Sequence, residues 1–72
     1  MTKEEIRKLI EAGFPDSSVH VSGDDGQHFE ADVSWSGFAG LSMVKQHQAV
    51  YAALGGKMGR EIHALALKTR AG

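Results

Sequence analysis

Two short stretches of alternating polar and apolar residues, separated by a turn sequence, constrain this fold more than any other feature. The first stretch covers residues 18–22 and the second residues 28–35, with Gly23-Asp24-Asp25-Gly26 between them. Alternation with a period of two is typical of a strand that is covered on one face. Aspartate and glycine are typical of tight turns. We therefore predict a β-hairpin with one apolar face and one polar face.

On both sides of this hairpin, apolar residues recur at the three- and four-residue spacing of a helix. Before it, Thr2 and Glu5 match a capping box and predict a helix over about residues 3–12. After it, a second helix is predicted from about Leu41 to Leu54, where Gly55-Gly56 ends it. Positions three and four apart predict the buried stripe of this second helix, which comprises Val44, His47, Val50, Tyr51 and Leu54, followed by Met58.

An apolar run over residues 61–69 predicts a third strand. A helix links it to the second strand, so these two strands should be parallel, with a right-handed crossover. The predicted fold is α+β, in the order αββαβ, with a three-stranded mixed sheet and both helices on one face. Alternation places His63, Leu65 and Leu67 on one face of the third strand, and Ile62, Ala64 and Ala66 on the other.

Composition narrows the class of protein. The chain has 72 residues and no cysteine, and a chain of this length encloses one core, so we predict a single domain over residues 1–72. A net charge of −1 and a pI near 6.4 lack the basic excess typical of nucleic-acid-binding domains. The sequence contains no cysteine nucleophile and no serine elbow motif, so these two signs of an enzyme are missing. No apolar run is long enough to cross a membrane. We expect a cytoplasmic, non-enzymatic domain.

Several motifs together resemble the BolA family over nearly the whole chain. They are Phe38-x-Gly40, the run His47-x-x-Val50-Tyr51-x-x-Leu54, the hairpin ending Gly26-Gln27-His28-Phe29, and the closing run from Ile62 to Lys68. The short hairpin loop is most similar to the branch of acid-stress-associated BolA-like proteins. The resemblance implies an αββαβ fold related to the type II KH domain.

The resemblance also implies a function and a cofactor. It implies an adaptor that partners a monothiol glutaredoxin in iron–sulfur cluster binding, assembly or trafficking. In such a pair a 2Fe–2S cluster is bridged by glutaredoxin and glutathione thiolates and by histidine from the BolA-like chain, which holds no cofactor when isolated. His63 matches the family histidine and is the first metal-ligand candidate. Taken without the resemblance, a histidine at the mouth of a strand is more often structural or exposed than a metal ligand.

The second metal ligand is an open question. The family takes it from a cysteine or histidine in the hairpin loop, and this loop has neither. Asp25 stands roughly in the cysteine's place, but a carboxylate suits harder metals than a soft cluster, so we predict a turn residue there. His28 follows the loop and is the second ligand candidate; the alternatives are a solvent-facing strand residue or one packed in the hairpin. For His20 we expect a cross-strand surface contact, and for His47 a satisfied, partly buried contact.

A nucleic-acid-binding transcriptional regulator of the stress response is the alternative function, with DNA or RNA as the partner. Lys45, Gln46 and Gln48 lie in a helix-turn-helix-like segment where the family often has arginines, and glutamine can read adenine edges. Affinity rests mostly on phosphate neutralisation, which the near-neutral charge does not favour. The sequence from Gly56 through Lys57 to Gly59 spells the GxxG loop of KH domains, although such glycines also simply end a helix.

Overall fold

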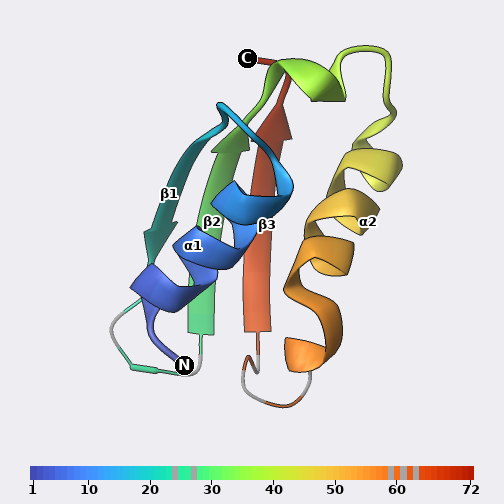
Figure 1. Cartoon of the computed structure of the whole chain (residues 1–72). Helices are drawn as coiled ribbons and strands as arrows, with labels where there is room; N and C mark the ends of the chain where they lie inside the picture. Colours follow the sequence, from blue (N-terminus) through green and yellow to red (C-terminus); the bar gives the residue numbers. More distant parts are fainter. Residues whose placement is uncertain (24, 27, 59, 61, 63) are drawn as a thin grey trace.

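The sheet is built around strand β2 (His28–Ser34), which has a neighbour on each side. Strand β1 (Ser18–Ser22) pairs antiparallel with β2, and β3 (Ala64–Arg70) pairs parallel with it. This computed structural model describes residues 1–72 except residues 24, 27, 59, 61 and 63 (Figure 1). The hairpin, the parallel pair and the α+β order αββαβ are therefore confirmed.

Helices α1 (Lys3–Gly13) and α2 (Met43–Leu54) both cover one face of the sheet, as predicted (Figure 1). The capping box of α1 is present: the Thr2 N–H donates to Glu5 Oε1 at 2.9 Å, and the Glu5 N–H donates to Thr2 Oγ1 at 3.2 Å. The bond from the Thr2 backbone N–H to the carboxylate, with a smaller contribution from the Thr2 side chain, lowers the pKa of the Glu5 carboxyl. No helix in the described part of the chain is long and apolar enough to cross a membrane.

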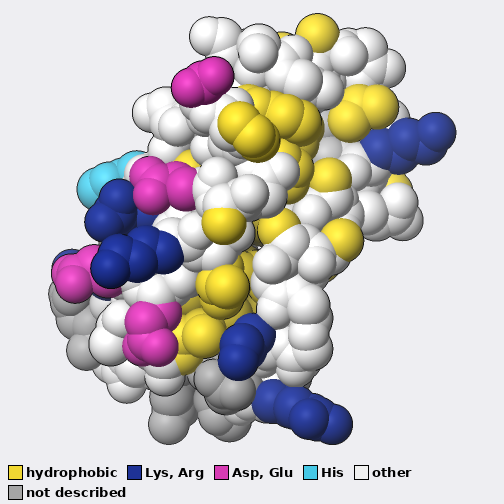
Figure 2. Space-filling view, viewed as in Figure 1, with side chains coloured by type: hydrophobic (Ala, Val, Ile, Leu, Met, Phe, Trp, Pro, Cys, Tyr) yellow, Lys and Arg dark blue, Asp and Glu magenta, His cyan; other side chains and the backbone are white. Residues whose placement is uncertain are grey.

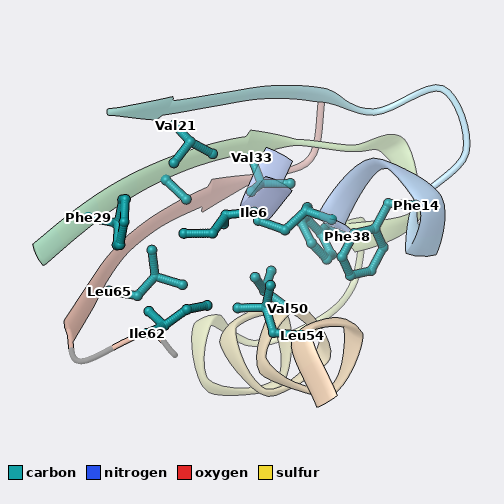
Figure 3. Packing of buried hydrophobic residues seen from close by; sticks show 12 residues of the cluster. Ile6, Phe14, Val21, Phe29, Val33, Phe38, Val50, Leu54, Ile62 and Leu65 are labelled. Carbon is teal, nitrogen blue, oxygen red and sulfur yellow. The ribbon is translucent and has the colours of Figure 1, made fainter. Parts of the chain in front are cut away.

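The core lies between the sheet and the two helices (Figure 3). Ile6 from α1, Val33 from β2 and Val50 from α2 are each 0% exposed, so both helices and the sheet meet there. An aromatic triangle of Phe14, Trp35 and Phe38 lies in and against this core, with ring centroids 4.8 to 5.3 Å apart. The Trp35 indole N–H donates to the carbonyl oxygen of Pro15 at 2.8 Å and so joins the residues after α1 to the end of β2.

Helix α2 begins at Met43 rather than at Leu41, because the Ser42 side chain caps it by accepting the Lys45 N–H at 3.2 Å. The predicted buried stripe is wrong in part. Val50 and Leu54 are buried, but Val44 is 65% exposed and Tyr51 is 38% exposed.

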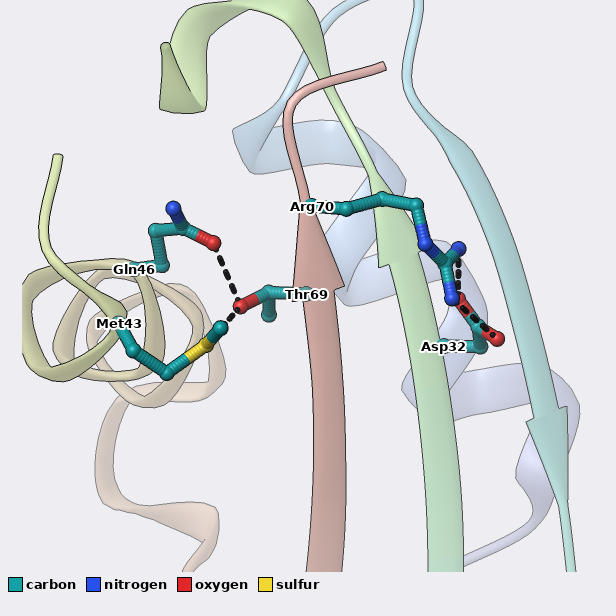
Figure 4. A network of polar contacts seen from close by, with 5 residues as sticks. All are labelled: Asp32, Met43, Gln46, Thr69 and Arg70. Carbon is teal, nitrogen blue, oxygen red and sulfur yellow. Dashed lines mark hydrogen bonds and ion pairs between the residues drawn. The ribbon is translucent and has the colours of Figure 1, made fainter. Parts of the chain in front are cut away.

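Gln46 takes a buried position on α2 instead, at 8% exposure. Its Oε1 accepts the Thr69 hydroxyl at 2.7 Å (Figure 4), and its Nε2 donates to the Leu41 carbonyl oxygen at 3.0 Å. Thr69 lies on β3, and its hydroxyl is also 3.2 Å from the Met43 sulfur. A pattern of helical spacing predicts that a glutamine lies on the surface. It cannot show that Gln46 is buried, because the groups that hydrogen-bond its amide come from other parts of the chain.

Strand β3 is shifted from the predicted range of residues 61–69, since it begins at Ala64 and ends at Arg70. Within it, Leu65 is buried and Leu67 packs against the core, while Ala64 and Ala66 are exposed on the opposite face, as predicted. Ile62 was predicted on the face of these alanines but is 0% exposed. It lies outside β3, in an isolated bridge with Met58, so the alternation of the strand does not reach it.

Candidate metal centre

The second ligand candidate, His28, lies at the end of the sheet where both parallel strands begin. It is the first residue of β2, and its Cα partner across the ladder is Ala64, the first residue of β3 (Figure 1). His63 precedes Ala64 in the sequence and lies outside the described residues, so its role stays a prediction.

The carboxylate of Asp25 contacts His28 at two points. Asp25 Oδ1 accepts the backbone N–H of His28 at 2.8 Å, and Oδ2 lies 2.7 Å from the ring Nδ1. The first bond fits the predicted turn role of Asp25. The side chain of His28 is 68% exposed, and its other ring nitrogen, Nε2, makes no hydrogen bond within the described residues. The imidazole as a whole is therefore accessible from solvent.

Gly23 allows the chain to close against this pair. Its φ is +144°, and a Cβ there would lie 2.5 Å from the His28 carbonyl oxygen and 2.9 Å from the Phe29 ring. No larger side chain fits that approach without a shift of the backbone, so glycine holds the end of β1 against the start of β2.

A hollow on the uncovered face of the sheet adjoins His28. The exposed residues Ala64 and Ala66 form its β3 side, and their small side chains leave space beside the imidazole. The lining residues are Ser22, Gly23, His28, Phe29, Glu30, Ala64, Leu65 and Ala66. A partner could therefore approach the imidazole from this face.

Further along the same face, Asp32 and Arg70 form a two-point ion pair, at 2.5 Å for Oδ1 to Nη1 and 3.0 Å for Oδ2 to Nη2 (Figure 4). The hydrogen bonds from Arg70 lower the pKa of Asp32, and those to Asp32 raise the pKa of Arg70. His20 is exposed on β1 opposite Asp32, which agrees with the predicted cross-strand surface position.

His47 is half-buried on α2, as predicted. The prediction that it is satisfied is wrong for Nε2, which is buried and has no hydrogen-bond partner in the described part of the chain.

The donor set fits a shared metal centre rather than a complete one. Within the described residues, no group of three or more His, Cys, Asp or Glu side chains could hold a metal ion. An iron–sulfur cluster takes about four protein ligands. At the hairpin end, the described part of the chain therefore offers a single accessible imidazole, that of His28, and a metal bound there would need its other ligands from elsewhere.

The residues predicted for nucleic-acid binding are not brought together as one polar surface. Lys45 and Gln48 are exposed on α2, whereas Gln46 faces the core and its amide is already hydrogen-bonded. Gly56 and Lys57 lie in the short 3-10 helix η2 (Gly55–Lys57), and Gly59 lies outside the described residues. Figure 2 shows scattered apolar side chains on the helix side of the molecule. Within the described residues, the exposed large apolar side chains are Leu41, Met43, Val44 and Tyr51, and the last three lie on α2.

The fold and the site define a class: a small αββαβ domain that presents a histidine at the hairpin end, beside an uncovered sheet face. The family model for BolA-like proteins matches residues 11–72, and the chain belongs to the BolA family. Protein RP812 of Rickettsia prowazekii is 30% identical over 71 residues, which cover 96% of this chain and 92% of that protein.

Solved structures agree with this assignment. A bolA protein homologue from Coxiella burnetii is 43% identical, with a TM-score of 0.86, over 99% of this chain and 91% of that one. The BolA domain of SufE1 from Arabidopsis thaliana is 25% identical, with a TM-score of 0.81, over 96% of this chain and 90% of that one. The similarity therefore extends over essentially the whole domain.

Proposed function

We propose that the chain is a non-enzymatic cytoplasmic adaptor that partners a monothiol glutaredoxin in binding, assembling or passing on a 2Fe–2S cluster. Membership of the BolA family supports this function through the resemblance described above. The observation that carries it is the accessible imidazole of His28 at the hairpin end, beside a hollow on the uncovered sheet face. His63 is the first ligand candidate and His28 the second.

The chemistry of the donors favours a shared cluster. Imidazole is a suitable ligand for iron, and it raises the reduction potential of a cluster when it replaces thiolate. The chain has no cysteine, so the sulfur ligands would come from glutaredoxin and glutathione. The chain's own residues would contribute one or two nitrogen ligands and the surface that receives the partner.

The test is to mix the chain with a cluster-loaded monothiol glutaredoxin and glutathione and to record visible absorption and circular dichroism. We expect the wild-type chain to change the spectrum, and His63→Ala and His28→Ala each to reduce that change. The matched control is His20→Ala, because His20 is an exposed histidine of the same sheet away from the hairpin end. A wild-type chain that leaves the spectrum unchanged would refute the function, and a His63→Ala variant identical to wild type would refute that ligand.

Nucleic-acid binding is the second candidate, and it has one specific observation in its favour. Residues 33–60 contain no Asp or Glu, and Lys45 is exposed within that stretch. The buried Gln46 and the apolar surface of α2 weigh against it. It predicts binding to DNA or RNA that falls steeply with salt and that is lost on combined Gly56→Asp and Gly59→Asp substitution. Retention insensitive to salt would contradict it.

A further inference from the structure

The hairpin loop lacks the expected ligand but places a carboxylate against the ring of His28. We propose that Asp25 is a positioning residue: it holds the neutral His28 imidazole with its proton on Nδ1 and leaves the Nε2 lone pair outward as the ligating atom. The ligating role rests on the proposed function, whereas the position of the proton does not. Asp25 would thus support a metal ligand without being one.

The geometry on the ring side determines which nitrogen carries the proton. An ionised carboxylate only accepts hydrogen bonds, and Asp25 Oδ2 lies 2.7 Å from Nδ1. Nδ1 must therefore be the donor. A neutral imidazole has one N–H, so Nε2 is then the acceptor, with a lone pair free for a metal. Histidine ligands in metalloproteins are commonly oriented in this way by a carboxylate on the other ring nitrogen.

A hydrogen bond to the backbone of His28 holds the Asp25 carboxylate in place. Asp25 Oδ1 accepts the His28 backbone N–H at 2.8 Å, so the same carboxylate is attached to both the main chain and the ring of one residue. Gly23 closes the other side of the turn, since a Cβ there would lie 2.5 Å from the His28 carbonyl oxygen. The ring therefore has a defined orientation although the side chain of His28 is 68% exposed.

An isosteric substitution separates this role from that of a simple turn residue. In Asp25→Asn, the amide oxygen can still accept the His28 backbone N–H, but the amide nitrogen then faces Nδ1 and donates to it. The ring proton must move to Nε2, which occupies the atom that a metal would need. Asp32→Asn is the matched control. Asp32 lies on the same strand as His28, but its carboxylate binds Arg70 instead of a histidine ring.

The experiment is a long-range ¹⁵N–¹H correlation spectrum of the histidine rings, recorded without metal at a pH of about 9, well above the ordinary histidine pKa of about 6.5. We expect the Nδ1–H form of His28 in the wild type and the Nε2–H form in Asp25→Asn. The tautomer ratio should change at least about tenfold, the effect of about 1.4 kcal/mol. Asp32→Asn should leave it unchanged. Wild-type His28 in the Nε2–H form, or no effect of Asp25→Asn, would overturn the proposal.

The ligating half of the proposal is tested on the same variants with cluster-loaded glutaredoxin. Asp25→Asn should weaken the spectral change as His28→Ala does. If the tautomer inverts but both variants give the wild-type spectrum, His28 is not a ligand and that half is overturned, while His63 remains a candidate. If the wild-type chain gives no spectral change at all, the proposed function has failed, and the ring spectrum still decides the position of the proton.

Discussion

The buried hydrogen bond between Thr69 and Gln46 gives a sharp test of how α2 is held against the sheet. Thr69→Val replaces the hydroxyl with a methyl group of similar size. Thr69 is 6% exposed and Gln46 8% exposed, so the Gln46 Oε1 loses its donor at 2.7 Å and cannot turn to water. An unpaired buried acceptor costs about 1–3 kcal/mol. In a domain of this size each kcal/mol lowers Tm by about 4–8 °C.

A double-mutant cycle isolates the pair. Gln46→Leu alone leaves the Thr69 hydroxyl with the Met43 sulfur, a weak acceptor at 3.2 Å. The combined variant with Thr69→Val removes both polar partners, so its loss of unfolding free energy should be smaller than the sum of the two single losses by about 1 kcal/mol.

The assay for this cycle is urea unfolding followed by Trp35 fluorescence, because Trp35 is the single tryptophan of the chain and packs against the core. Thr69→Ser is the control that keeps the hydroxyl. Strictly additive losses, or a Thr69→Val variant as stable as wild type, would show that Gln46 is not held as described.

Four further substitutions test other parts of the structure. Gly37→Ala should cost about 1–3 kcal/mol of unfolding free energy and change the Trp35 emission, since a Cβ there would lie 2.4 Å from the indole ring; unchanged emission would contradict that packing. Val44→Ala should change the unfolding free energy by no more than about 0.5 kcal/mol, whereas Leu54→Ala should cost about 2–5 kcal/mol in the same urea titration. The hydrogen bond from Arg70 lowers the pKa of Asp32 in the fold, so ionised Asp32 contributes stability above about pH 4 that is lost as pH falls through the lowered pKa. The difference in unfolding free energy between wild type and Asp32→Asn should therefore shrink below about pH 4. A difference that stays constant with pH would contradict this ion pair.

Local patterns predicted most of the fold. The capping box at Thr2 and the hairpin depend on residues close together in the chain, and both appear as expected. The face of α2 did not follow from its own sequence, because Gln46 is buried through a hydroxyl on β3. Ile62 was misplaced because the strand was expected to begin before Ala64.

The candidate site was predicted by residue type rather than by geometry. His28 was chosen for its place after the loop, and its pairing with Asp25 was not foreseen. A signal for it was present, since an aspartate three residues before a strand-initiating histidine can accept that histidine's N–H. His63 was chosen from the resemblance, and it stays a prediction because it lies outside the described residues.

We propose that an imidazole of this chain binds iron in a cluster shared with a glutaredoxin. Pulsed electron paramagnetic resonance on the reduced complex tests it directly, with ¹⁵N-histidine placed only in this chain. We expect ¹⁵N hyperfine couplings from the labelled chain, which disappear when His63 and His28 are both replaced by alanine. A reduced cluster in the complex without any nitrogen coupling from this chain would show that none of its histidines binds the iron.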